Sequence, residues 1–148
     1  MKLSEHFTLE ELCFSAASAR LGLDNTPGAS VFANLSRLAV CMELVRALLG
    51  GEAIVVHSAY RSPKTNQSVG GVRTSAHCLG LACDFECPEF GSPGTVATTI
   101  LNSTIDYDQL IREYGWVHIA IAQEGLHPRR QALTKRSTGA PYENGILA

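Results

Sequence analysis

The chain lacks several features that would direct it to particular classes of protein. No apolar run approaches the length of a membrane span, and its first residues lack the apolar core of a signal peptide. Neither sign of charge dominates: 12 Lys and Arg stand against 14 Asp and Glu, for a net charge of -2. This balance gives no electrostatic attraction to nucleic acid. We therefore expect a protein made in the cytoplasm, without membrane insertion and without a nucleic-acid partner.

Five cysteines cannot all pair within one chain, so we interpret them as reduced thiols. Repeats and low-complexity segments are also absent. A length of 148 residues, 45% of them hydrophobic and 18% charged, is typical of one globular domain. We expect that domain to span residues 1–148, to be a monomer, and to end in a loose tail from about residue 137.

Periodicity and capping signals indicate an α+β fold. Thr8 and Glu11 form a capping-box pattern that begins a helix ending by about Ala19. Glycines and prolines punctuate the rest of the chain. Further helices are predicted over about 31–49, 63–69 and 93–102, and strands over 53–60, 82–87, 107–111 and 116–122. We expect a small, mostly antiparallel sheet flanked by helices.

One short stretch, Ser75 to Asp84, combines groups that bind metals. It places the imidazole of His77 seven residues before the carboxylate of Asp84. His118 lies in an alternating strand, on the face opposite Val117 and its apolar partners. Imidazole nitrogen and carboxylate oxygen suit zinc, and a catalytic zinc takes three protein ligands plus one open position. On residue types and spacing alone, core or surface histidines and a turn aspartate explain these residues equally well.

A wider pattern decides between these interpretations. It consists of Ser58-Ala-Tyr-Arg-Ser-Pro, Asn66, Val69-Gly-Gly, Ser75-x-His77-x-x-Gly80-x-Ala82-x-Asp84 and Trp116-x-His118. In this order it resembles the zinc D-alanyl-D-alanine carboxypeptidase family (peptidase family M15, subfamily A), and in particular its phage endolysin branch. The resemblance covers about residues 4–135. It implies the fold shared by these peptidases and the hedgehog signalling domain, and one zinc ion held by His77, Asp84 and His118.

The resemblance also implies residues that bind substrate. Arg61 occupies the position of the family's substrate-binding arginine, and a guanidinium there can grip a peptide carboxylate with two parallel hydrogen bonds. By type alone, Arg61 is an ordinary surface arginine. Ser75 matches the family's site serine, although a turn serine explains it too. Trp116 falls where several relatives carry a second histidine, so we expect it to form part of the pocket wall.

The chain departs from part of the family at the position of the general base. Many relatives carry an acid three residues before the last histidine, where this chain has Gly115. Other members place their acid further back, and Glu113 is the nearest carboxylate. We therefore predict that Glu113 is catalytic together with Arg61; the alternative is a solvated turn residue. Asp106 and Asp108 precede the intervening strand and fit less well.

The remaining candidates are predicted to have structural roles. Cys78, Cys83 and Cys87 match no common zinc-cysteine spacing, and the last two lie on the strand face opposite Asp84. Cys41 is expected to pack beside a helix stripe. His57 could approach the site or simply lie at the surface.

The resemblance implies a zinc metallopeptidase that hydrolyses a stem-peptide bond of peptidoglycan, as a carboxypeptidase or an endolysin-type endopeptidase. Without a signal peptide, such an enzyme would be made in the cytoplasm and reach the bacterial wall with help from a protein such as a holin. The alternative is a module that keeps zinc but only binds wall or protein, as hedgehog domains illustrate. A third interpretation, a phage structural component, rests only on small size and a basic segment near the C-terminus.

Overall fold

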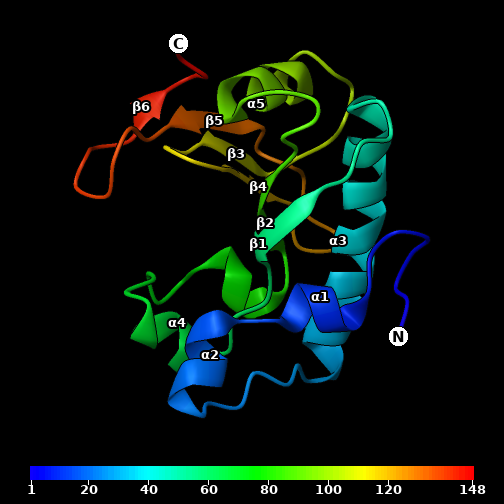
Figure 1. Cartoon of the computed structure of the whole chain (residues 1–148), viewed down its shortest axis with the longest axis vertical. Coiled ribbons are helices and arrows are strands. Elements are labelled where there is room, and N and C mark those ends of the chain that lie inside the picture. Colours follow the sequence, from blue (N-terminus) through cyan, green and yellow to red (C-terminus); the bar gives the residue numbers. More distant parts are fainter.

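The computed structural model describes all 148 residues as a six-stranded sheet with helices around it (Figure 1). The strand order is β1-β2-β4-β3-β5-β6, and every pairing is antiparallel except that of β3 with β5. The predicted α+β class with a mostly antiparallel sheet is therefore confirmed. The elements are α1 (Leu9–Cys13), α2 (Ala16–Leu21), α3 (Ala29–Leu48), β1 (Val55–Ser58), α4 (Pro63–Ser68), the 3-10 helix η1 (Ala76–Leu79), β2 (Ala82–Glu86), α5 (Pro93–Leu101), β3 (Gln109–Arg112), β4 (Val117–Ala120), β5 (Gln131–Thr134) and β6 (Glu143–Asn144).

The N-terminal segment forms two short helices, so the prediction of a single helix there was wrong. Thr8 caps α1 as predicted, with its hydroxyl accepting a hydrogen bond from the Glu11 backbone N–H at 3.1 Å. The helix stops at Phe14, whose backbone is extended. Ser15 then caps α2 by accepting from the Ser18 N–H at 3.1 Å. A second capping residue, able to satisfy the free N–H groups of a new helix, explains the break.

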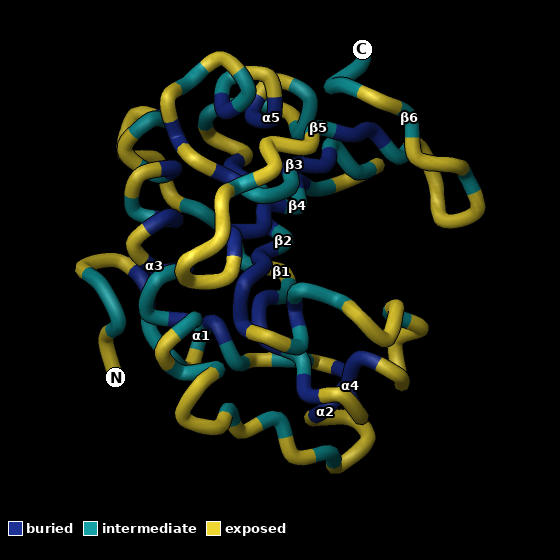
Figure 2. The backbone as a smooth tube through the Cα atoms, turned by 180° about the vertical axis from the view of Figure 1, so that it is seen from behind, coloured by how far each residue is buried: buried dark blue, intermediate teal, exposed yellow.

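One face of the sheet carries the apolar core. The apolar stripe of α3 is completely buried, and it joins residues of α5 and of the sheet in a single cluster. Figure 2 shows the same division, with buried residues concentrated along the central strands and exposed residues in the surrounding loops. No helix is long and apolar enough to cross a membrane. The buried residues that form this layer include Leu35, Leu38, Met42, Val45 and Leu49 from the α3 segment, Val96 and Ile100 from α5, and Cys83, Phe85, Leu110, Val117 and Ile119 from the sheet.

The other face of the sheet carries three polar groups in a row across β1, β2 and β4. Ser58 pairs with Asp84 and Asp84 with His118, so these three side chains share one face, together with the apolar Ile111, which pairs with His118. In Figure 1, α1, α2 and α4 gather at the lower end of the molecule, below β1 and β2. This arrangement places the segment between α4 and β2 next to the polar row.

The C-terminal segment contributes two strands that the sequence did not predict. β5 pairs in parallel with β3, and β6 pairs with β5 through Thr134 and Glu143. Arg136 also forms an ion pair with Glu143 at 2.8 Å. Part of the tail that we expected to be loose is thus paired with the sheet.

Candidate metal centre

The 3-10 helix η1 fixes the position of His77. The Ser75 hydroxyl caps this helix and accepts a hydrogen bond from the His77 backbone N–H at 3.2 Å, and Gly80 ends it with a left-handed backbone (φ 72°). The ring nitrogen Nδ1 of His77 donates to the Ala59 carbonyl at 2.6 Å. Since a carbonyl only accepts, this contact fixes the proton on Nδ1 and leaves the Nε2 lone pair free for a ligand.

Strand pairing brings Asp84 and His118 together beside His77. The two residues are direct partners across β2 and β4. One carboxylate oxygen of Asp84 lies 2.8 Å from His118 Nδ1, and the other lies 3.3 Å from His77 Nε2. The two imidazole rings meet edge to face, with centroids 5.2 Å apart. All three predicted ligands therefore converge, although 34 residues separate Asp84 from His118.

The electrostatics of the cluster favour the forms that metals bind. Burial lowers the pKa of the His77 imidazole, which keeps this ring neutral at pH 7. Burial alone would raise the pKa of Asp84, but the two histidines outweigh it and hold the pKa of this carboxyl well below its usual range. A neutral imidazole and an ionised carboxylate are the ligand forms that a cation requires.

The donor set fits one zinc ion. The ligand atoms of His77, Asp84 and His118 all lie within 4.8 Å of one another. Atoms bonded to a tetrahedral zinc at about 2.0–2.2 Å lie roughly 3.3–3.6 Å apart, so small side-chain shifts would bring these atoms to bonding distance. Two imidazoles and one carboxylate leave a coordination position open, as in catalytic rather than structural zinc sites.

Arg61 follows β1 and lies next to the cluster. Its backbone N–H donates to the His77 carbonyl at 3.2 Å, which ties this residue to η1. Burial lowers the pKa of its guanidinium, and the nearby Asp84 carboxylate opposes that effect. The side-chain nitrogen Nε is buried and has no hydrogen-bond partner. An unpartnered buried donor is costly, so this arginine is suited to bind an anion that the chain itself does not supply.

The turn between β3 and β4 carries Glu113 and Trp116. The Glu113 N–H donates to the Trp116 carbonyl at 3.0 Å, so the two residues pair one step beyond Arg112 and Val117. Because side chains alternate along a strand, Glu113 and Trp116 share the face of His118. Burial raises the pKa of the Glu113 carboxyl, and the Asp84 charge acts in the same direction. Trp116 is half-buried and packs edge to face against Tyr114, with ring centroids 4.6 Å apart.

Other sequence candidates lie outside this cluster. His57 pairs with Glu86 at 2.6 Å, and Asp108 pairs with Arg129 at 2.8 Å. Asp106 is 82% exposed, 3.8 Å from Arg130. The cysteines are unpaired, and those expected to be buried are buried, with burial raising the pKa of the Cys83 thiol far above its usual value. The Ala59 carbonyl was missed, because a backbone acceptor leaves no signal in residue types.

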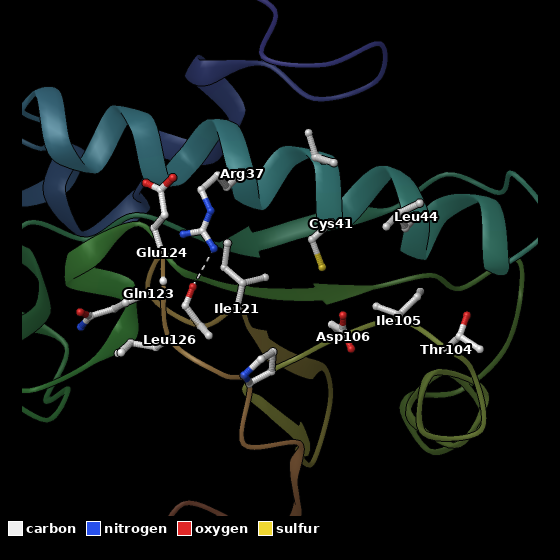
Figure 3. A pocket seen from close by; sticks show the side chains of 14 residues that line it. Arg37, Cys41, Leu44, Thr104, Ile105, Asp106, Ile121, Gln123, Glu124 and Leu126 are labelled. Atoms are coloured by element: carbon white, nitrogen blue, oxygen red, sulfur yellow. Dashed lines mark hydrogen bonds between the residues drawn. The ribbon is translucent and has the colours of Figure 1, made fainter.

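A cavity of about 600 Å³ is lined by none of the three ligands; Figure 3 shows the side chains that do line it. It is bounded by α3 and by the segments around residues 104–106 and 121–128. The Arg37 guanidinium reaches across it and donates to the Ala122 carbonyl at 2.9 Å. None of the three ligands lines this cavity, and neither do Arg61 and Glu113; of the carboxylates considered as a base, only the less favoured Asp106 does.

Gly80 offers a test of how η1 positions His77. A Cβ at Gly80 would lie 3.0 Å from both Val31 Cγ1 and the Val31 carbonyl oxygen, in a left-handed backbone conformation. We expect Gly80→Ala to lower the free energy of unfolding by about 1–3 kcal/mol, measured by denaturant titration. Gly115→Ala is the matched control, since its added Cβ meets nothing within 4 Å. Equal stabilities of the two variants would contradict this view of η1.

Two comparisons with known proteins complete the description. A family model described as Peptidase M15 matches residues 5–120, which is most of the chain and includes all three candidate ligands. No curated protein matches the chain.

Proposed function

The chain belongs to the M15 peptidase family, and on this premise we propose that it is a zinc-dependent peptidase that hydrolyses a stem-peptide bond of peptidoglycan. One observation carries the proposal. His77, Asp84 and His118 converge on one face of the sheet, near the unpartnered Arg61 and the half-buried Glu113. A set of metal-binding groups with an anion binder and a half-buried acid contains the groups that peptide hydrolysis needs.

His77, Asp84 and His118 would hold the ion, and zinc bound there supplies a Lewis acid that polarises the scissile carbonyl and activates a water. The chain's own groups prepare this site. The Ala59 carbonyl fixes the tautomer of His77, and strand pairing fixes the distance between Asp84 and His118. The hydrogen bond and the strand pairing both hold the ligands in place before substrate arrives. Less conformational entropy is therefore lost when the substrate binds.

Arg61 and Glu113 have the two remaining roles, substrate binding and proton transfer. Arg61 binds a substrate carboxylate and so orients the peptide across the site. Glu113 takes a proton from the attacking water and returns it to the leaving amine nitrogen. Its raised pKa suits both tasks, because the carboxylate is more basic than an exposed glutamate. Ser75, the N-cap of η1, and Trp116, which shares the face of His118, would contact the substrate beside them.

We further propose that the enzyme is made in the cytoplasm, acts as a monomer, and reaches the bacterial wall with help from another protein. The second candidate function is a module that binds zinc and wall peptides without cutting them. Gly115, which stands where many relatives carry their acid, favours this alternative. The position of Glu113 on the face of His118 favours the enzyme.

A digest of purified peptidoglycan tests the proposal. The zinc-loaded protein should release new amino termini, a chelator should stop their release, and added zinc should restore it. Mass spectrometry of the fragments identifies the bond. Binding to peptidoglycan without any new amino terminus would leave the binding module as the function.

A further inference from the structure

A second cation follows β5, on the face of the sheet that carries His118. Lys135 follows β5, and its backbone N–H donates to the Arg112 carbonyl at 2.9 Å. Leu133 pairs with Ile111, and Ile111 with His118, so alternation along the chain places Lys135 on the same face as His118. Glu113 and Lys135 also line one pocket of about 230 Å³ beside the β3–β4 turn.

Lys135 is the unpaired cation of this pocket. Arg112 donates to the Leu147 carbonyl, and Arg136 pairs with Glu143 at 2.8 Å. Lys135 is half-buried and forms no ion pair; its ammonium instead lies 4.4 Å from the ring centroid of Tyr142. An aromatic face holds an ammonium in place without neutralising its charge, so Lys135 remains available to an anion.

The distance from the ligands to Lys135 determines how many substrate residues can lie between the scissile bond and a group bound by Lys135. Asp84 and His118 lie on β2 and β4 and His77 lies in η1, while Arg61 follows β1 and Lys135 follows β5. From β4 to β5 there are two strand intervals, or about 10 Å, which an extended peptide covers in about three residues. A substrate that uses both cations therefore carries one carboxylate next to the scissile bond and another about three residues away.

We propose that Lys135 binds a second substrate carboxylate, the α-carboxylate of the γ-linked D-glutamate of a stem peptide cut at its terminal D-Ala-D-Ala bond. This inference rests on the proposed peptidase function and adds the bond and the direction of the substrate. In such a pentapeptide the terminal carboxylate is next to the scissile bond and meets Arg61. The glutamate is the third residue on the other side, which matches the separation of Lys135 from the ligands.

The test uses two synthetic pentapeptides, L-Ala-γ-D-Glu-L-Lys-D-Ala-D-Ala and the same peptide with the glutamate α-carboxylate amidated. The zinc-loaded wild type should release D-Ala from the acid with a kcat/KM about tenfold above that for the amide, as expected for a charge-assisted hydrogen bond. Lys135→Ala should lose this preference, because any effect of its charge on Glu113 acts equally on both peptides, and Lys135→Arg should keep it. Lys2→Ala, which removes an exposed lysine far along the chain, is the control.

Zinc content and thermal midpoint, measured for every variant, show that each one is folded. Equal rates of the wild type on the two peptides, or an unchanged preference in Lys135→Ala, would overturn the role of Lys135. Release of D-Ala from neither peptide would overturn the bond assignment and the inference with it. The peptidase function itself fails only if the peptidoglycan digest also yields no new amino terminus.

Discussion

His118→Ala should abolish zinc binding and peptide cleavage together. The substitution leaves one imidazole and one carboxylate, and two ligands hold a catalytic ion far less tightly than three. It also leaves Asp84 without its 2.8 Å partner, although the carboxylate keeps His77. The fold should survive, because the apolar core lies on the opposite face of the sheet. Zinc per chain and the rate of stem-peptide cleavage are the two measurements.

His57→Ala is the matched control for the ligand variants. His57 also lies on the sheet near Asp84, but its ring pairs with Glu86 rather than with the ligand cluster. Its loss should leave zinc content and cleavage near the wild-type values, while His77→Ala should behave like His118→Ala. Full zinc binding by either His77→Ala or His118→Ala would show that the ion binds elsewhere on the protein.

Glu113→Gln should lower the rate of cleavage on the order of 100- to 10,000-fold while zinc content stays unchanged. Glutamine keeps nearly the same shape but cannot take a proton from the attacking water. Glu113 lies outside the ligand set and accepts no side-chain hydrogen bond within the chain, so its replacement should not disturb the centre. Steady-state kinetics on a stem peptide, with zinc measured in parallel, give the result.

Two further variants sharpen this comparison. Glu124→Gln changes an exposed glutamate away from the centre and should have no effect. Arg61→Ala should weaken substrate binding and turnover together, because it removes the group that orients the peptide, and should keep zinc. If Glu113→Gln cleaves as fast as the wild type, the metal centre stands but the base is another carboxylate, with Asp106 and Asp108 next to be tested.

The sequence predicted which three side chains converge better than it predicted the elements around them. His77 and Asp84 lie close together in a motif with little freedom of spacing, and the alternation around His118 specified its face. The break between α1 and α2 was missed because one continuous apolar pattern hid the cap at Ser15. β5 was missed because it has only four residues and depends on a partner, β3, that lies about twenty residues earlier in the chain.

The contacts of the groups that surround the three ligands could not be predicted from the sequence. The Ala59 carbonyl, the buried Nε of Arg61 and the position of Lys135 beside Glu113 all arise from contacts between segments far apart in the chain. Residue type and spacing do not predict such contacts. A motif can therefore predict which groups converge on one site, while the contacts that surround this site are identified only from the fold.

Elemental analysis of the wild-type protein tests the central claim most directly. After purification in the presence of zinc and removal of the excess, the chain should carry about one zinc ion, because two imidazoles and one carboxylate converge with an open position. A protein that retains no transition metal under these conditions would contradict the metal centre, and with it the peptidase and the zinc-binding module alike.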